Sequence, residues 1–445
     1  MSSDILNISL GTLIETSSLF DIQLDDRSEI KNLQNKYLVR TLQENTSKKL
    51  TNSDYFKYFT FGCMDFIVYE EDKEKKFYFI EINGTGMAGI SNLPDYYFNI
   101  ITNSISQNIE FIQDDDYPVI LVPFSGTDCY KTSGSIKLVY ERILYAQAIK
   151  NVLREEFGKS TILTFKNLLN QSGFTQDIPT VVMGYVKDIY DHIHAKDGRL
   201  YLFNRPVAAS LHDQFCCDLL KKFQSQIDKD SFVPINGINK LAADKGVSYQ
   251  LYNDLLSKKS YNYIDRQVIF NFAYNKEDLF KQVLDNIDAG KKIVIKPHSS
   301  ELGRGIEFFV SKEPKYKIIR KIEESLKYTE QFYSPSGNVF PYTISEYVDG
   351  TTISNSTHPL KGHKYEVRIV VYRENNEIKS FPSLVKIASE KYDPKNISRY
   401  MLLNNVAAST GKKKSASTNF SLPACNYKTL KTLGFSKYHL EELCN

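Results

Sequence analysis

The chain contains 445 residues, of which 42% are hydrophobic and 24% are charged, as in ordinary globular proteins with a large core. Its 56 basic and 53 acidic residues nearly balance, which argues against a protein devoted to nucleic acid or membrane surfaces. We find no apolar run of about 18 residues and no basic segment leading into an apolar one, so we expect neither a membrane span nor a signal peptide. The six cysteines form no C-x-x-C pair, which favours a cytoplasmic location without a zinc site.

Three regions follow one another along the chain. Residues 55–83 contain two stretches of alternating apolar residues around EDKEK, which predicts a half-buried hairpin. Over 116–235, short apolar runs such as YPVILVPF alternate with helical patterns, which predicts an α/β domain. Over 236–445, a helical stretch is followed by the strands KKIVIKP, PYTISEYVDG and YEVRIVVY. We therefore predict an α/β protein, α+β in part, divided at 1–115, 116–235 and 236–445.

The predicted hairpin carries three oxygen-bearing side chains. Asp65 opens one strand, and Glu81 and Asn83 end the other, two residues apart and thus on one face. Such ligands suit Mg²⁺ with phosphate oxygens completing its shell. The ordinary alternative is a solvated strand end with a turn-forming Asn, because exposed acids are common.

A lysine strand and a glycine loop follow one another at 293–309. Lys296, at the end of IVIK, is placed to reach a phosphate as a point charge. Gly303 and Gly305 allow backbone to approach a phosphate closely, and Glu301 is a further candidate metal ligand. An edge strand beside an ordinary turn explains the same letters.

The segment ISEYVDG is typical of a strand that leaves a core through a turn. Glu346, Tyr347 and Val348 precede Asp349 and Gly350 there, and their backbone groups suit the edge of an adenine ring. A strand that simply ends in a D-G turn is the competing interpretation.

Arg368 alternates with apolar residues in YEVRIVVY, so we expect it to be partly buried and to need an anionic partner. A phosphate, a substrate carboxylate, or an acid of the chain such as Glu366 would serve equally. Together the four motifs supply the parts of a phosphoryl-transfer site: lysines, metal carboxylates, a glycine lid, an adenine hinge and an arginine.

These residues resemble the ATP-grasp superfamily. GCMDFIVYEEDKEKKFYFIEINGTGMAGIS is similar to the metal-binding segment of D-alanine–D-alanine ligases, and KKIVIKPHSSELGRGIEFF to their lysine strand and lid. The metal segment precedes the lysine strand, and this circularly permuted order resembles eukaryotic-type glutathione synthetases. The segment GTGMAGIS lacks the serines of a γ-glutamylcysteine site, so another acid and another amine are expected.

The resemblance implies an ATP-grasp fold with two lobes around the nucleotide and an inserted α/β substrate-binding domain. It implies nucleotide contacts from Lys245, Lys296, Gly303, Gly305, Glu346, Tyr347, Val348, Thr352 and Lys386. It implies metal ligation by Asp65, Glu81, Asn83 and Glu301. The candidate substrate contacts are Arg205, Arg368, Ser125 and Asn405, with Thr127 and His212 added for their positions in loops.

The implied activity is a carboxylate–amine ligase that uses ATP and two or more Mg²⁺ ions, forms an acylphosphate, and has Lys296 and Arg368 as catalytic residues. The alternatives are an ATP-grasp kinase for a small molecule and a nucleotide-binding module without turnover. The implied partners are small carboxylates and amines, without nucleic acid or membrane, and a homodimer is a candidate assembly.

Overall fold

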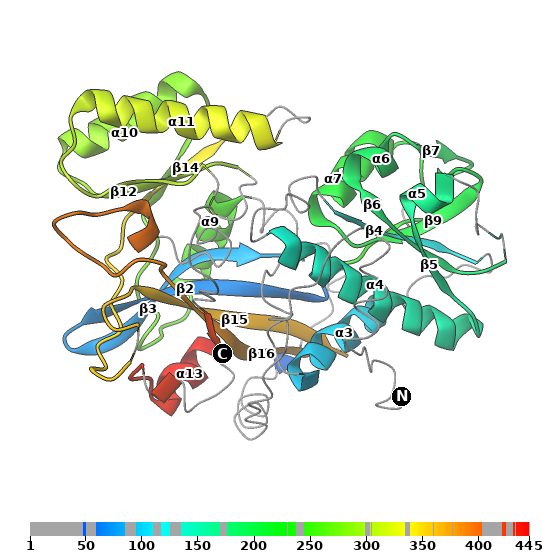
Figure 1. Cartoon of the computed structure of the whole chain (residues 1–445), viewed down its shortest axis with the longest axis horizontal. Helices are drawn as coiled ribbons and strands as arrows, with labels where there is room; N and C mark the ends of the chain where they lie inside the picture. The colour runs from blue at the N-terminus through cyan, green and yellow to red at the C-terminus, as the bar shows by residue number, and fades with distance from the viewer. Residues whose placement is uncertain are drawn as a thin grey trace.

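The fold is described from a computed structural model of the chain. It describes residues 48–49, 59–84, 95–109, 117–124, 135–169, 175, 177–228, 230–236, 244–298, 303, 305–333, 339–358, 360–375, 377–402, 421–423, 430–431 and 433–444. These residues form three sheets with helices packed on them (Figure 1). No helix within these ranges has the length and apolar character needed to cross a membrane.

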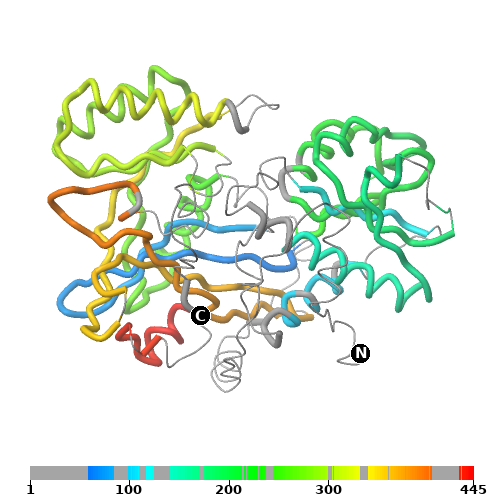
Figure 2. Tube along the Cα trace, in the orientation of Figure 1, coloured from blue at the N-terminus to red at the C-terminus, as the bar shows by residue number. Residues whose placement is uncertain are grey.

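The first sheet joins two hairpins from distant parts of the chain. β2 (Phe61–Glu71) and β3 (Glu74–Asn83) form one, which confirms the hairpin predicted from the sequence. β15 (Tyr365–Glu374) and β16 (Glu377–Ile387) form the other, and β15 pairs antiparallel with β2. Figure 2 shows the blue and orange segments side by side in this sheet. Two short strands, β1 (Lys48–Lys49) and β17 (Ser421–Pro423), also pair with β16.

The second sheet belongs to the middle of the chain and is parallel at its centre. Its strand order is β5-β6-β4-β9-β8-β7, and β10 also pairs with β9. The strands are β4 (Val119–Phe124), β5 (Thr161–Thr164), β6 (Thr180–Tyr185), β7 (Ile193–Lys196), β8 (Arg199–Leu202), β9 (Arg205–Ser210) and β10 (Val233–Pro234). Its helices are α4 (Ser135–Phe157), α5 (Phe165–Leu169), α6 (Val186–Tyr190) and α7 (Asp213–Phe223). Alternating strands and helices over this region confirm the predicted α/β pattern.

The third sheet is antiparallel, in the order β11-β14-β12-β13. Its strands are β11 (Phe270–Ala273), β12 (Ile293–Lys296), β13 (Glu307–Phe309) and β14 (Tyr342–Glu346). One side of it is covered by α10 (Lys276–Asp288) and α11 (Lys315–Tyr333), the yellow-green layer of Figure 1. Leu279, Val283 and Ile322 from these helices pack with Ile295 and Ile344 of the sheet in one core cluster.

Helices also connect the sheets. α3 (Asp95–Ile109) and α4 contribute to a core cluster that contains residues of both the first and the second sheet, such as Cys63 and Ile120. α9 (Lys245–Leu256) and α13 (Lys437–Cys444) pack on the first sheet through Tyr249 and Leu440. The mixed α/β class predicted from the sequence is therefore confirmed.

Candidate active site

The strand register of the first sheet gathers five charged side chains. Asp65 on β2 lies opposite Glu81 on β3 and opposite Arg368 on β15. Glu366, two residues before Arg368, lies opposite Lys386 on β16. Residues two apart on a strand share a face, so these charges collect on one side of the sheet. We call these five residues the charge cluster.

Asp65 is the centre of the charge cluster and is fully buried. Its Oδ1 accepts a hydrogen bond from Arg368 Nε at 2.7 Å and its Oδ2 accepts one from Arg368 Nη2 at 2.7 Å, a bidentate pair. Lys386 Nζ also donates to Oδ2, at 2.9 Å. Burial raises the pKa of Asp65, but the charges of Arg368 and Lys386 outweigh burial and hold this pKa well below its usual range. The carboxylate is therefore ionised at neutral pH.

Glu366 shares Lys386 with Asp65 through a second ion pair. The pKa of Glu366 is raised to about 7, because burial and the charges of Asp65 and Glu81 outweigh the opposing charge of Lys386. Lys386 remains a cation, because Asp65 and Glu366 outweigh the effect of burial and raise its pKa. Near neutral pH the charge cluster thus has two full cations, while one of its three acids is partly protonated.

Glu81 and Asn83 end β3 beside Asp65. Asn83 Nδ2 donates to Asp65 Oδ2 at 2.9 Å and to Glu81 Oε1 at 3.3 Å. Glu81 Oε2 lies 3.6 Å from Lys245 Nζ, and its side chain is 22% exposed, whereas that of Asp65 is fully buried. Glu81 is therefore the acid of the charge cluster that a ligand can reach.

The predicted magnesium site is modified by these contacts. Among the residues that the structure describes, no group of three or more His, Cys, Asp or Glu side chains is arranged to hold a metal ion. Asp65 is the counter-ion of Arg368 and Lys386, so we no longer assign it as a metal ligand. Glu81 and Asn83 remain, and one carboxylate with one amide oxygen suits a Mg²⁺ ion that keeps waters and phosphate oxygens. Glu301 lies outside the described residues.

Two buried lysines approach the charge cluster from other elements. Lys245 begins α9. Asp244 caps the N-terminus of this helix, where its side chain accepts a hydrogen bond from Gly246 N at 3.0 Å. Lys296 ends β12, contacts the Tyr249 hydroxyl and lies 5.0 Å from the centre of the Tyr249 ring. Burial lowers the pKa of Lys296 to about 8. The structure thus places both lysines predicted for the nucleotide near Glu81.

The predicted hinge follows β14. The Glu346 carboxylate accepts a hydrogen bond from Tyr78 Oη at 3.2 Å and pairs with Arg266. Tyr347 N donates to Lys292 O at 3.0 Å, and Val348 is buried. The Glu346 side chain therefore supports the strand, and any ligand contact from this residue would come from its backbone.

Two described glycines after β12 have backbone conformations that favour glycine. Gly303 and Gly305 have φ values of +69° and +67°, which favour glycine. A Cβ at Gly305 would lie 2.5 Å from Thr329 Oγ1, so no larger residue fits there. Arg399 contacts Gly303 O and pairs with Glu307 at 3.0 Å, which ties this loop to the segment after β16.

Of the predicted substrate residues, Arg205 has a different role in the structure. It begins β9, at the amino end of the parallel strands, and is only 3% exposed. Its guanidinium donates to Thr175 O at 2.8 Å, to Ile178 O at 2.9 Å, to Thr180 Oγ1 at 3.1 Å and to Tyr117 O. These bonds tie loop ends together, and we do not retain Arg205 as a substrate ligand.

The other loop candidates divide into two groups. His212 caps α7 by accepting from Phe215 N at 3.2 Å, which is a structural role. Thr352 forms a backbone bridge with Lys364 beside the hinge. Ser125, Thr127 and Asn405 lie outside the described residues.

Sequence reasoning missed two residues beside the predicted site. Tyr249 holds Lys296, and it lies four residues after Lys245 on a helix, so helical spacing was a usable signal. Lys364 is buried and donates to Tyr347 Oη at 2.7 Å while lying 3.9 Å from the Tyr392 ring centre. No local pattern distinguishes Lys364 from an ordinary surface lysine, because its partners come from other segments.

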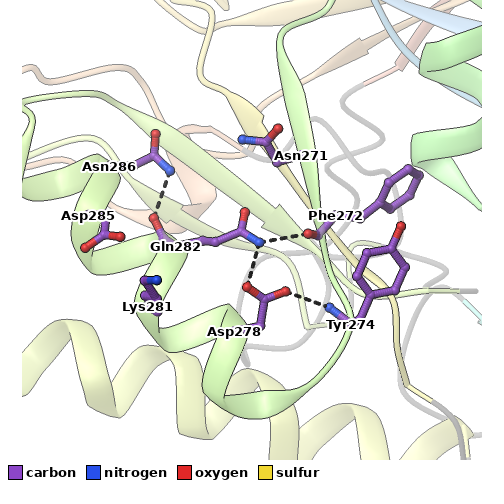
Figure 3. Close-up of a pocket in the computed structure, with 8 residues that line it drawn as sticks. All are labelled: Asn271, Phe272, Tyr274, Asp278, Lys281, Gln282, Asp285 and Asn286. Carbon is purple, nitrogen blue, oxygen red and sulfur yellow. Dashed lines mark hydrogen bonds between the residues drawn. The ribbon is translucent and has the colours of Figure 1, made fainter.

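A separate hollow of about 530 Å³ lies between β11 and α10 (Figure 3). There Gln282 Nε2 donates to Phe272 O at 2.8 Å and to Asp278 Oδ1 at 2.9 Å, and Tyr274 N donates to Asp278 Oδ2 at 3.1 Å. These side chains of α10 satisfy backbone groups along β11, so we interpret the hollow as part of the edge of the third sheet. None of the charge cluster lines it.

Comparison with known proteins gives structural neighbours only. No protein-family model matches the sequence, and no curated protein matches it. The chain is similar to a putative gamma-glutamylcysteine synthetase from Methylobacillus flagellatus, at 11% identity, over 92% of this chain and 91% of that one, with a TM-score of 0.43. It is similar to a glutathione synthetase-like effector from Globodera pallida, at 11% identity, over 79% and 80% of the two chains, with a TM-score of 0.35.

A third similar structure is D-alanyl-alanine synthetase A from Vibrio cholerae, at 12% identity, over 55% of this chain and 76% of that one, with a TM-score of 0.29. Scores of this size carry no argument about activity, so function is argued from the geometry of the charge cluster.

Proposed function

We propose that the chain is an ATP-grasp enzyme that activates a carboxylate with ATP and joins it to an amine, releasing ADP and phosphate. The observation that carries this proposal is the convergence of four buried cations from four elements on the reachable carboxylate Glu81. Lys245 pairs with it directly at 3.6 Å. Arg368 and Lys386 pair with Asp65, which lies opposite Glu81 on the neighbouring strand. Lys296 contacts Tyr249 on the helix that Lys245 begins.

The balance of charge supports a polyphosphate ligand. Lys245, Lys296, Arg368 and Lys386 are opposed by Asp65, Glu81 and Glu366, and Glu366 has a pKa of about 7. Buried cations in excess of their counter-ions favour an anion with several charges. Transfer of a phosphoryl group to a carboxylate needs neutralisation of charge more than proton transfer, which fixed cations provide.

Specific roles follow from the contacts. Lys245 and Lys296 would bind phosphate oxygens, and Glu81 and Asn83 would hold a Mg²⁺ ion, which supplies further neutralisation of phosphate charge when bound. Arg368 would act with one side of its guanidinium held by Asp65, so its orientation is fixed before a ligand arrives. An acylphosphate formed in this way must be kept from water until an amine displaces phosphate.

The test is ADP release from Mg-ATP with a panel of amino acids, dipeptides, hydroxy acids and polyamines, followed by mass spectrometry. The proposal predicts ADP only with a particular acid and amine together, and a product whose mass is their sum less water. A product that has gained a phosphate mass would instead identify a kinase. If the panel releases no ADP and Mg-ATP fails to bind the chain, the proposal is wrong.

A further inference from the structure

The carboxyl end of the second sheet is the place where open α/β sheets usually bind ligands. β4 and β9 are parallel neighbours there, and Leu211, which follows β9, donates from its N to Leu121 O at 2.8 Å. β10 extends this edge, since Ile235 N donates to Ser210 O at 2.8 Å. α4 packs over these strands in the core cluster that also contains residues of the first sheet.

Arg142 of α4 is buried at this edge, and no acid among the residues that the structure describes pairs with it. It is 5% exposed, and Nη1 donates to Leu211 O at 3.5 Å, the limit of a hydrogen bond. Within the described ranges it forms no ion pair and no second hydrogen bond. A buried guanidinium has five N–H donors and is costly unless it meets an anion or several acceptors. Its single long contact therefore leaves most of this cost uncompensated by the described residues.

The neighbouring groups do not supply the missing negative charge. His212 is neutral, because burial and then the charge of Arg142 lower its pKa well below the usual range. One further buried donor at this edge has no partner in the described part of the chain, Asn236 Nδ2, and Asn236 is 0% exposed. Ser210 pairs with Leu121 and faces the other side of the sheet, away from α4. The edge therefore combines a cation that no described acid pairs with and one unused donor, which suits a carboxylate.

This edge is joined to the strand that carries Asp65. Asn236 Oδ1 accepts from Thr60 N and Phe61 N, each at 3.2 Å, where β2 begins. Glu141, the neighbour of Arg142, and Asp65 both raise the pKa of the Cys63 thiol, so α4 lies near the charge cluster. A ligand held at this edge would thus lie beside the site of phosphoryl transfer.

We propose that Arg142, with Asn236 at the same edge of the sheet, binds a carboxylate group of a small-molecule substrate. The identification of the ligand as a substrate rests on the proposed function, whereas the carboxylate-binding site does not. The inference assigns to α4 the role that the sequence had suggested for Arg205.

The first test is binding of succinate and L-glutamate to the full chain by titration calorimetry, with succinamide as the uncharged control. We expect saturable binding of at least one acid and none of succinamide. In Arg142→Met the dissociation constant for that acid should rise on the order of 30-fold or more, as for other desolvated charge pairs. Arg154→Met is the matched control on the same helix, since Arg154 is exposed, and should bind like the wild type.

The second readout is the thermal midpoint, which separates a ligand site from a structural role. An arginine that is unpaired in the free protein costs stability, so Arg142→Met should unfold at the same temperature as the wild type or higher. A lower midpoint, unchanged acid binding in Arg142→Met, or no binding of either acid to the wild type would each overturn the inference. Mg-ATP binding is measured in parallel: its absence alongside Arg142-dependent acid binding would reject the ligase and leave the carboxylate site standing.

Discussion

Arg368 on the first sheet and Arg142 on α4 are buried in opposite ways. Arg368 is 4% exposed and meets the Asp65 carboxylate through two bonds of 2.7 Å. Arg142 is 5% exposed and meets one carbonyl oxygen at 3.5 Å. The two guanidinium groups are equally buried, but the described residues satisfy only that of Arg368. We therefore assign the charge of Arg368 to the framework of the protein and that of Arg142 to a ligand.

Arg205 shows that a carboxylate is not required for compensation. Arg205 lies at the amino end of the parallel strands, whereas Arg142 lies at their carboxyl end. Four oxygen acceptors surround the Arg205 guanidinium. What sets Arg142 apart is therefore the number of acceptors, not the lack of an acid. The comparison predicts that removing each of these charges will affect stability in a different direction or by a different amount.

The largest effect on stability should come from removing the carboxylate that pairs with Arg368. Asp65→Ala leaves Arg368 buried without its acid and Lys386 with Glu366 alone. We expect a loss of about 3–5 kcal/mol in the free energy of unfolding, read from urea midpoints. Glu71→Ala is the control, because Glu71, on the same strand as Asp65, is exposed and its ion pair with Lys76 of β3 should contribute less than about 1 kcal/mol. Equal midpoints for the two variants would refute the framework role of Asp65.

Lys296→Ala tests a buried cation that we assign to the ligand rather than to the framework. Turnover of the ligase should fall on the order of 10²-fold or more, as when one preorganised electrostatic group is removed. The thermal midpoint should not fall in proportion, since burial already disfavours the charge of Lys296. Lys291→Ala, an exposed lysine just before the same strand, should retain normal turnover. Turnover like the wild type in Lys296→Ala would reject the assignment.

Local patterns in the sequence predict the elements of the charge cluster well. Alternation identified the hairpin of β2 and β3, and the i, i+2 spacing placed Glu81 and Asn83 on one face. Alternation also predicted a buried Arg368 that needs an anion, and left open which one. The answer depends on the pairing of β2 with β15, which no local rule brings together, since Asp65 and Arg368 are 303 residues apart.

Roles were harder to predict than positions. Asp65 was expected to bind a metal, but strand pairing surrounds it with two cations and an amide. Arg205 was chosen from a resemblance in its strand, whereas its contacts come from loop ends that the sequence does not place. Arg142 lies within a helical pattern that was correctly predicted, yet nothing in that pattern reveals that no acid of the described residues pairs with it. Compensation of a buried charge is a property of tertiary structure.

Arg205→Met sharpens the comparison within the second sheet. The substitution leaves the carbonyl groups of Tyr117, Thr175 and Ile178 without this donor. We expect a loss of about 2 kcal/mol in the free energy of unfolding, because unsatisfied acceptors cost about 1–3 kcal/mol each when buried and less when water reaches them. Arg142→Met, measured in the same urea series, should show no loss. If both variants lose the same amount, Arg142 is structural and the contrast between the two edges disappears.

The smallest effect concerns pH and the charge of Lys296. Its pKa of about 8 means that the protonated form, which binds phosphate, is lost as pH rises through 8. Apparent ATP affinity should therefore weaken about tenfold between pH 7 and pH 9, following the protonated fraction of Lys296.

The pKa of Lys296 in the folded chain lies below the ordinary value of 10.5, so the unfolded chain binds more protons between these two values, and the free energy of unfolding should rise with pH there. Opposite trends in affinity and stability would exclude alkaline unfolding as the cause, and Lys296→Arg, which stays charged, should bind ATP equally at both pH values. A wild-type affinity that does not change with pH would show that Lys296 does not contact the nucleotide as a cation.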